Sequence, residues 1–386
     1  MFGEAGVKRE LFIFAVFIVC IVFTPAMMVS GADNTDDGGE YISIDDFDIK
    51  DSEKALDNNG YKDLNIKKIL NEIMSGNVLG VINQCKNTVY EKTIGDVSTV
   101  EKTLGNLLLI VILSAFFTNF ANVFSNESIS STGFYICYLL SITLMLALFD
   151  RFCIIASDFV KLLLEFMCGI IPAYFISVAI TGQVSAAGFY QLALVVIGVV
   201  EFVFLRILIP LIKVFVVISL VNNISKEDFL SKTTDIIKNL VGFINKTVVG
   251  IVAGLNIIQA LILPAVDGAK NTTIRKVVGA LPVVGDSTDA VTGIVLGSVN
   301  LIKNTIGGFS IIIIVLICAV PFIKIQMYSI SMQIAQAVVQ PVADKRILNS
   351  ISCMVQGIKM LAKVIAGAAI LFIISIAIIC MVTGKG

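Results

Sequence analysis

Residues 280–308 read ALPVVGDSTDAVTGIVLGSVNLIKNTIGG, residues 311–323 read IIIIVLICAVPFI, and residues 324–346 read KIQMYSISMQIAQAVVQPVADKR. The middle run is apolar enough to predict a membrane span. The first segment holds too many small and polar residues for an ordinary span. The third places apolar residues at helical spacing, which predicts an amphipathic helix. This succession predicts a helical membrane protein with an unusual junction near its C-terminal end.

The composition of the whole chain points in the same direction. Hydrophobic residues make up 57% of the 386 residues and charged residues 15%, whereas roughly a quarter of a typical soluble domain is charged. We therefore predict an all-α, polytopic helical membrane protein. A small N-terminal extracytoplasmic region, part helical and part disordered, is expected to precede the membrane domain.

The N-terminal region is predicted to be exported. Residues 1–32 have the basic start, apolar centre and small-residue exit of a signal peptide, with an uncleaved anchor helix as the alternative. Residues 33–60 are acidic and predict a disordered linker. Apolar residues recur at helical spacing in 61–104, which predicts amphipathic helices at the outer membrane surface or against a partner.

Apolar runs divide the rest of the chain into predicted spans. The run at 186–221 is too long for one span, and we interpret it as a hairpin, with one broken helix lining a polar cavity as the alternative. Lysine and arginine between the last two spans predict that this segment faces the cytoplasm. The first membrane part, 105–264, has predicted spans near 105–124, 133–149, 160–181, 186–221 and 248–264; the second, 265–386, comprises the small-residue tract, a span at 306–323, an amphipathic elbow at 324–363 and a span at 364–382.

Several classes of chemistry are excluded or disfavoured. The chain has no histidine, which excludes histidine-based triads and histidine-rich zinc sites. It has no GxxxxGK[ST] loop, so any ATP-driven step requires another subunit. Most of its eight cysteines lie in apolar runs, which predicts no disulfide framework. We expect no enzyme activity, no catalytic residue, no cofactor, no metal and no nucleic-acid partner.

Of the charged residues that interrupt the apolar runs, four are candidates for a function within the membrane. Lys161 and Glu165 are four apart, so they share a helix face and can pair. Glu201 and Arg206 are five apart, which places them on different faces of a straight helix. A charge within lipid is costly unless it is paired, so these residues are candidates for an ion or proton path. The alternatives are an interfacial pair at a helix end and a solvated turn.

Small residues and a basic pair mark candidate assembly or gating positions. Gly293 and Gly297 form a small-xxx-small pattern, which lets helices approach closely in lipid, although ordinary tight packing explains it equally well. Pro341 is expected to break the amphipathic helix. The basic pair beyond it could dock a partner or contact anionic lipid heads. The selected positions are Gly285, Asp286, Gly293, Gly297, Gly307, Gly308, Gln340, Pro341, Asp344, Lys345 and Arg346.

The segments ALPVVGDSTDAVTGIVLGSVNLIKNTIG, 280–307, and VVQPVADKRI, 338–347, resemble the stage III sporulation protein AE family of endospore-forming bacteria. The order of signal, acidic head and multiple spans agrees with that resemblance. It implies a mother-cell protein in the membrane around the engulfed forespore. It also implies a multi-subunit assembly, similar in parts to specialised secretion systems and thought to form a channel. The implied partners are other membrane subunits, including a separate ATPase, the lipid bilayer and further copies of the chain.

The sequence leaves two functions open. The first is a multi-pass cell-membrane subunit of the channel complex that links mother cell and forespore, required for forespore development after engulfment. The second is a stand-alone secondary transporter or permease for a small solute, in which Lys161, Glu165, Glu201 and Arg206 would line the path. A lone transporter commonly carries an inverted repeat, and the sequence contains no convincing one.

Overall fold

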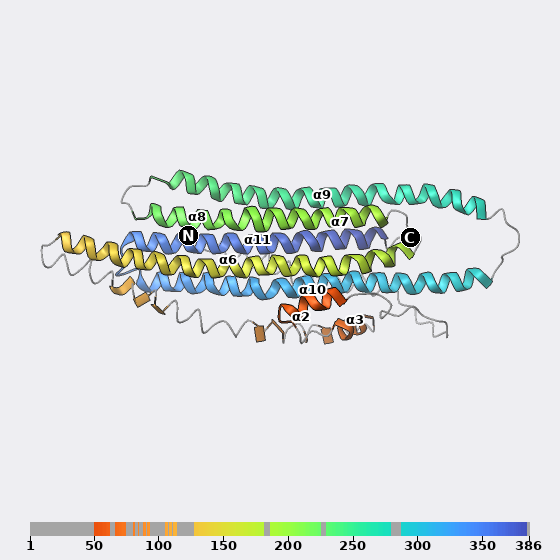
Figure 1. Cartoon of the computed structure of the whole chain (residues 1–386), viewed down its shortest axis with the longest axis horizontal. Coiled ribbons are helices and arrows are strands. Elements are labelled where there is room, and N and C mark those ends of the chain that lie inside the picture. Colours follow the sequence, from red (N-terminus) through yellow and green to blue (C-terminus); the bar gives the residue numbers. More distant parts are fainter. Residues whose placement is uncertain are drawn as a thin grey trace.

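Long antiparallel helices form the body of the protein (Figure 1). The computed structural model describes residues 50–61, 66–74, 127–180, 186–224, 229–278 and 287–383, together with short pieces between 80 and 113. Every element in these described ranges is helical, which confirms the predicted all-α class. The long helices are α6 (Glu127–Ile180), α7 (Ala186–Val200) continuing through η2 (Glu201–Leu208) into α8 (Ile209–Asn222), α9 (Ser231–Val278), α10 (Ser287–Val339) and α11 (Lys345–Thr383).

The bundle is longer than a bilayer is thick. Each of five long helical segments, counting the α7–η2–α8 run as one, is long and apolar enough to cross a membrane, as the composition predicted. Helix α6 alone has 54 residues, about 80 Å at ~1.5 Å per residue. The hydrocarbon layer is only about 30 Å thick. Part of the bundle must therefore extend beyond the bilayer or be shielded from lipid.

The predicted division of residues 133–181 into two spans is wrong. Residues 133–149 and 160–181 were expected to be separate, yet α6 continues from Glu127 to Ile180 without a break. Asp150 and Arg151, between the two apolar runs, reach the surface of the bundle. Backbone hydrogen bonding of a helix does not stop at a charged pair that finds water or a partner, so the charges mark a surface and not a turn.

The predicted hairpin at 186–221 is also wrong. The chain passes from α7 to α8 through η2, a π-helical stretch in which the Ile209 N–H donates to the Phe204 carbonyl five residues earlier. Pro210 follows in the first turn of α8. Proline lacks the N–H that an α-helix needs and clashes with the carbonyl four residues before it. The wider π turn lets the chain pass this residue without reversing.

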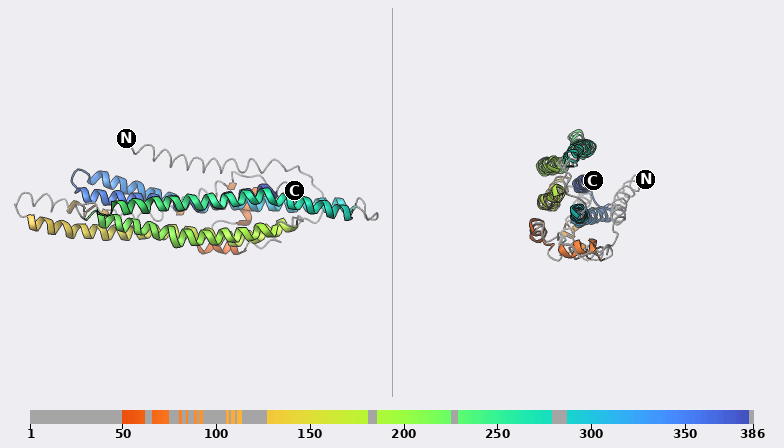
Figure 2. Two further views of the ribbon diagram at one scale, coloured as in Figure 1. Left: turned by 90° about the horizontal axis from the view of Figure 1, so that it is seen from above. Right: turned by 90° about the vertical axis from the view of Figure 1, so that its right-hand side faces the viewer.

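Two helices occupy the interior and one lies at the edge. The most apolar windows of α10 and α11 are 78% and 56% buried, whereas that of α9 is 17% buried. Aromatic contacts join α6 to α10: the ring centroids of Phe152 and Tyr328 lie 4.9 Å apart and those of Phe166 and Phe309 6.3 Å apart. The end view in Figure 2 places α9 at one edge and the N-terminal helices at the other.

Part of the predicted disordered linker is an ordered helix. Residues 50–58 of the segment predicted as 33–60 form α2 (Lys50–Asn58), with Ala55 and Leu56 buried. Gly60 has a φ of +79°, and the Tyr61 N–H donates to the Leu56 carbonyl at 2.9 Å. This closure is a Schellman motif, which satisfies carbonyls at the helix end.

A second short helix follows α2. The apolar stripe predicted in 61–104 begins with α3 (Ile66–Met74), in which Ile69 and Leu70 are buried. Helix α3 packs against α10, whereas α2 packs against α6. The predicted signal peptide, residues 33–49 and most of the predicted span at 105–124 lie outside the described residues.

Candidate functional site

The turn between α10 and α11 holds most of the candidate residues from the C-terminal motif. Helix α10 ends at Val339, two residues before Pro341, because a proline disfavours helical geometry in the residue before it. The Val339 carbonyl accepts the N–H groups of Val342 at 3.1 Å and Ala343 at 2.8 Å. Gln340 and Pro341 are exposed. The turn is therefore short and hydrogen-bonded, and α11 returns directly alongside α10.

Asp344 and Arg346 are held within the chain. The Asp344 carboxylate caps α11 by accepting the Arg346 backbone N–H at 2.8 Å. It also accepts the Arg346 side chain, Nε at 3.1 Å and Nη2 at 3.4 Å. The guanidinium carbon lies 3.7 Å from the ring centroid of Phe134 on α6. The Arg346 side chain is only 18% exposed, whereas Lys345 is exposed. Of the basic pair Lys345 and Arg346, Lys345 is therefore the residue that is available to contact lipid or a partner.

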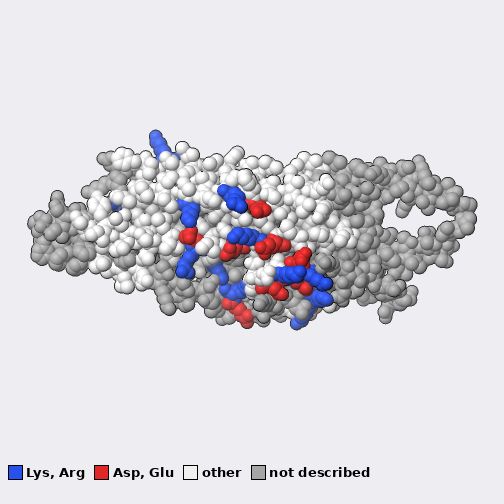
Figure 3. All heavy atoms as spheres, viewed as in Figure 1, with Lys and Arg blue, Asp and Glu red and all other residues white. Residues whose placement is uncertain are grey.

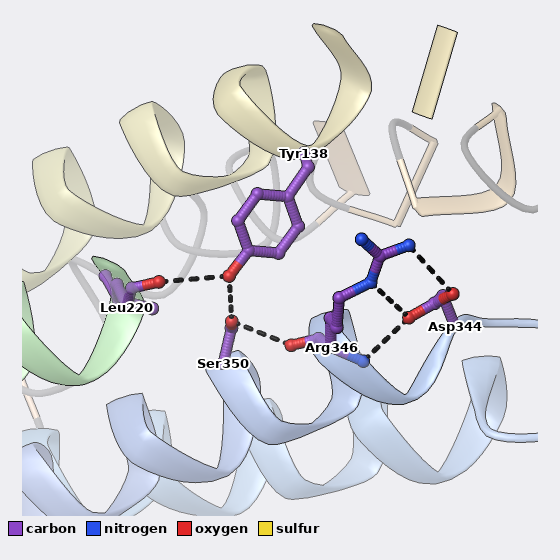
Figure 4. Close-up of polar contacts among 5 residues, drawn as sticks. All are labelled: Tyr138, Leu220, Asp344, Arg346 and Ser350. Atoms are coloured by element: carbon purple, nitrogen blue, oxygen red, sulfur yellow. Dashed lines mark hydrogen bonds and ion pairs between the residues drawn. The ribbon is translucent and has the colours of Figure 1, made fainter. Parts of the chain in front are cut away.

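A buried hydroxyl network fastens this turn to the rest of the bundle (Figure 4). The Tyr138 hydroxyl of α6 lies 3.0 Å from the Leu220 carbonyl of α8 and 2.8 Å from the Ser350 hydroxyl of α11. Ser350 lies 2.8 Å from the Arg346 carbonyl. Sequence reasoning missed this network. The available signal was a tyrosine within an apolar run, because a buried tyrosine hydroxyl usually requires a hydrogen-bond partner.

A second polar region, here called the charged belt, crosses the middle of the bundle (Figure 3). Lys213 of α8 forms an ion pair with Asp150 of α6. Lys161 lies 3.7 Å from Asp158 and not against Glu165, so the predicted Lys161–Glu165 pair is not formed. The belt consists of Asp150, Asp158, Lys161, Glu165, Glu201, Arg206 and Lys213.

Glu201 and Arg206 lie in η2 and are exposed. In a π-helix, hydrogen bonds join residues five apart, so these two residues are about one turn apart and face a similar direction. The prediction that they lie on different faces is wrong, because it assumed a straight α-helix. No ion pair joins them to any residue that the structure describes. Glu201 and Glu165 both lie within electrostatic reach of the exposed Cys168 thiol.

Helix α2 adds polar groups beside the belt. The Asn59 side-chain amide donates to Glu165 at 3.3 Å. Lys92 donates to the Asn59 carbonyl at 2.7 Å, and its ammonium lies 3.5 Å from the ring centroid of Tyr61. Burial of Tyr61 raises the pKa of its phenol above the usual value, so the group stays neutral. The α2 region is therefore joined to α6 by directional contacts.

The small residues of the C-terminal motif divide into two groups. Gly307 and Gly308 are buried in α10, and a Cβ atom at Gly307 would overlap the Cys380 sulfur and lie 3.5 Å from the Tyr174 ring. This arrangement is tight helix packing. Gly293 and Gly297 belong to α10, but their burial is outside what the structure describes. Gly285 and Asp286 lie outside the described residues altogether.

A small cavity lies where α6, α7, α9, α10 and α11 meet. Its volume of about 30 Å³ is room for about two water molecules. The lining is mostly apolar, its polar side chains are Tyr174, Asn256, Ser310 and Ser375, and Asn256 donates to Ser375 at 2.8 Å. No charged residue lines it. Among the described residues, no group of cysteine and acidic side chains has the arrangement of a metal site.

Comparison with known proteins finds one family whose sequence model spans almost all of the helices described above. The sequence model of the family described as stage III sporulation protein AE matches residues 64–383. The chain belongs to this family. One family relative, Stage III sporulation protein AE of Bacillus subtilis (strain 168), is 22% identical over 321 residues, which cover 81% of this chain and 80% of the relative. No solved structure matches the chain.

Membership in the stage III sporulation protein AE family confirms the resemblance drawn from residues 280–307 and 338–347, and it gives the chain a role in sporulation. The matched region extends from α3 to α11. It therefore includes both the α10–α11 turn and the charged belt.

Proposed function

We propose that this chain is a multi-pass membrane subunit of a channel or secretion-like complex that links the mother cell and the forespore. Forespore development after engulfment requires it, and it resides in the mother-cell membrane around the forespore. Its partners are other membrane subunits, including a separate ATPase. The observation that carries the proposal is the family match across 64–383, which coincides with a bundle of membrane-compatible helices.

The position of the charged residues supports an assembly subunit over a lone carrier. A stand-alone transporter binds its solute within the membrane bundle, between its repeats. Lys161 and Glu165 instead lie on the outer surface, as do Glu201 and Arg206. The cavity between the helices has no charged residue in its lining and has room for only about two water molecules. Charges on an outer surface suit contact with water or other subunits, and the proposed role is structural and not catalytic.

A clean deletion in the spore-forming host tests this function. We expect cells that complete engulfment and then arrest, with heat-resistant spores reduced by several orders of magnitude. Expression of the wild-type chain in trans should restore spores, and a fluorescent fusion should label the membrane around the forespore. A deletion strain with a normal spore yield would contradict the proposal.

Isolation of the chain from sporulating cells tests the assembly. In a mild detergent, we expect the full-length chain to co-purify with other membrane proteins and an ATPase. Recovery of the chain alone from cells that contain all the subunits, under several mild detergents, would count against an assembly role and would favour the carrier.

A further inference from the structure

The bundle presents two different surfaces at one level along its length. The small cavity marks this level: Met167 and Ile170 of α6 and Asn256 of α9 all line it, so these parts of α6 and α9 lie at the same height along the bundle. Around this level, α9 forms one edge of the bundle and α2 lies at the opposite edge (Figures 1 and 2). The chemistry of these two edges can therefore be compared at the same depth.

The α9 edge is apolar. No charged residue occurs from 247 to 266, a length close to the ~20 residues that cross a hydrocarbon layer. Four large side chains near Asn256 point outward and are between 41% and 73% exposed. A surface of this kind fits lipid. The four are Ile251, Leu255, Ile258 and Leu261.

The α2 edge is polar at the same depth. The side chains of Asp51 and Lys54 are 79% and 71% exposed. The helix is nevertheless an integral part of the fold, because the Ser52 hydroxyl donates to the Phe166 carbonyl of α6 at 3.4 Å. The absence of a side chain at Gly169 permits this approach, since a Cβ atom there would lie 2.6 Å from the Ser52 nitrogen.

The charged belt extends the polar surface from α2 onto α6 and η2. Lys161, Glu165, Glu201 and Arg206 are exposed and mix both signs of charge. Charged side chains are rarely placed against hydrocarbon because their transfer from water is costly. The core of a protein interface is also depleted of charge. An exposed surface with this composition fits water better than either lipid or a tightly packed partner.

We propose that α2 and the belt residues of α6 and η2 border a water-filled space at the depth where α9 contacts lipid. Within the complex, the chain turns its α9 edge to the bilayer and its α2 edge to an aqueous passage. This inference rests on the proposed assembly, because a single bundle surrounded by lipid would expose the same charges to hydrocarbon.

Thiol labelling in native membranes tests the inference. Cys168 is exposed on α6, one turn beyond Glu165, and provides a natural reporter for the polar edge. Three full-length chains would each carry one cysteine, at Cys168, at Asp57→Cys on α2, or at Ile258→Cys on α9. Membranes from sporulating cells, opened so that both sides are accessible, would be treated with a charged thiosulfonate reagent.

We expect Cys168 and Asp57→Cys to react roughly tenfold or more faster than Ile258→Cys, because the thiolate that reacts forms in water and not in hydrocarbon. An uncharged, lipid-soluble maleimide should reach Ile258→Cys. A chain that retains only the buried Cys318 is the matched control and should resist the charged reagent. Each chain must restore spores in the deletion strain before it is labelled.

Slow labelling of both Cys168 and Asp57→Cys, at the rate of Ile258→Cys, would overturn the inference. So would labelling that appears only after detergent extraction, because it would mean that lipid or a partner covers the surface. These outcomes leave the sporulation role intact if the deletion still blocks spores. Conversely, a normal spore yield in the deletion strain would reject the proposed function before any labelling is done, whereas the labelling rates test only which surfaces meet water.

Discussion

The two helices of the α10–α11 hairpin and helix α9 are each long and apolar enough to cross a membrane, yet they occupy opposite kinds of position. The hairpin is largely buried, closes through a hydrogen-bonded turn and is fastened to α6 by Arg346 and Tyr138. Helix α9 is mostly exposed and contacts chiefly α8 and α11. Helix α9 is also less apolar than either helix of the hairpin, but hydropathy alone does not decide burial: the α7–η2–α8 run is about as apolar as α10 and α11, yet its most apolar window is only 33% buried.

The largest effect is expected where a glycine of the hairpin permits close helix contact. A Cβ atom at Gly357 would overlap Val216 of α8 and lie 2.8 Å from the Phe149 ring of α6, whereas nothing lies within 4 Å of one at Gly250 on α9. Gly357→Leu should lower the free energy of unfolding by about 3 kcal/mol. Denaturant unfolding in detergent, followed by circular dichroism, measures this change.

Gly250→Leu is the matched control on α9. It should leave stability unchanged or raise it by up to about 1 kcal/mol, because leucine favours a helix over glycine. Equal losses in the two variants would mean that α9 is packed as tightly as the hairpin.

An intermediate effect is expected at the turn. Arg346→Ala removes two side-chain hydrogen bonds to Asp344 and the contact with Phe134. Hydrogen bonds to charged groups stabilise by roughly 1.5–3 kcal/mol, so we expect a loss of about 2 kcal/mol in the same assay. Lys345→Ala, one residue earlier and exposed, should change stability by less than about 0.5 kcal/mol. If the two variants lost equal stability, the turn would not be anchored through Arg346.

The smallest effect is expected from a single hydroxyl. Tyr138→Phe keeps the ring in place and removes the contacts with Leu220 and Ser350. Ser350 can still donate to the Arg346 carbonyl, whereas the Leu220 carbonyl loses the hydroxyl that donates to it. We expect a loss of about 1 kcal/mol, measured as above. Tyr135→Phe, on the exposed face of the same helix, is the control. An equal loss there would show that the buried hydroxyl network does not stabilise the bundle.

The sequence predicts helical class and the break near Pro341 because both depend on local patterns. It does not predict that α6 continues past Asp150 and Arg151, because whether charges end a helix depends on what surrounds them. The η2 segment is similar: Pro210 indicates a disruption, but a turn and a π-helix are equally compatible with it. The Asn-Gly pair at 59–60 does carry the helix-ending signal of α2, which the acidic composition around it obscured.

Contacts between distant residues are the part that one sequence does not contain. Tyr138 and Ser350 are 212 residues apart, and no local pattern links them. The same holds for Asp150 with Lys213 and for Ser52 with Phe166. A polar residue in an apolar run signals that a partner exists, but only the fold identifies the partner.

The most direct test of the contrast between the hairpin and α9 is tryptophan fluorescence in brominated lipid. The natural chain has no tryptophan, so one introduced indole reports its own surroundings. Ile258→Trp places the indole on the exposed face of α9. Phe372→Trp places it on the buried face of α11, where the adjoining cavity provides space for the larger ring. We predict strong quenching by brominated acyl chains for Ile258→Trp and little for Phe372→Trp. Equal quenching at the two positions would contradict this prediction.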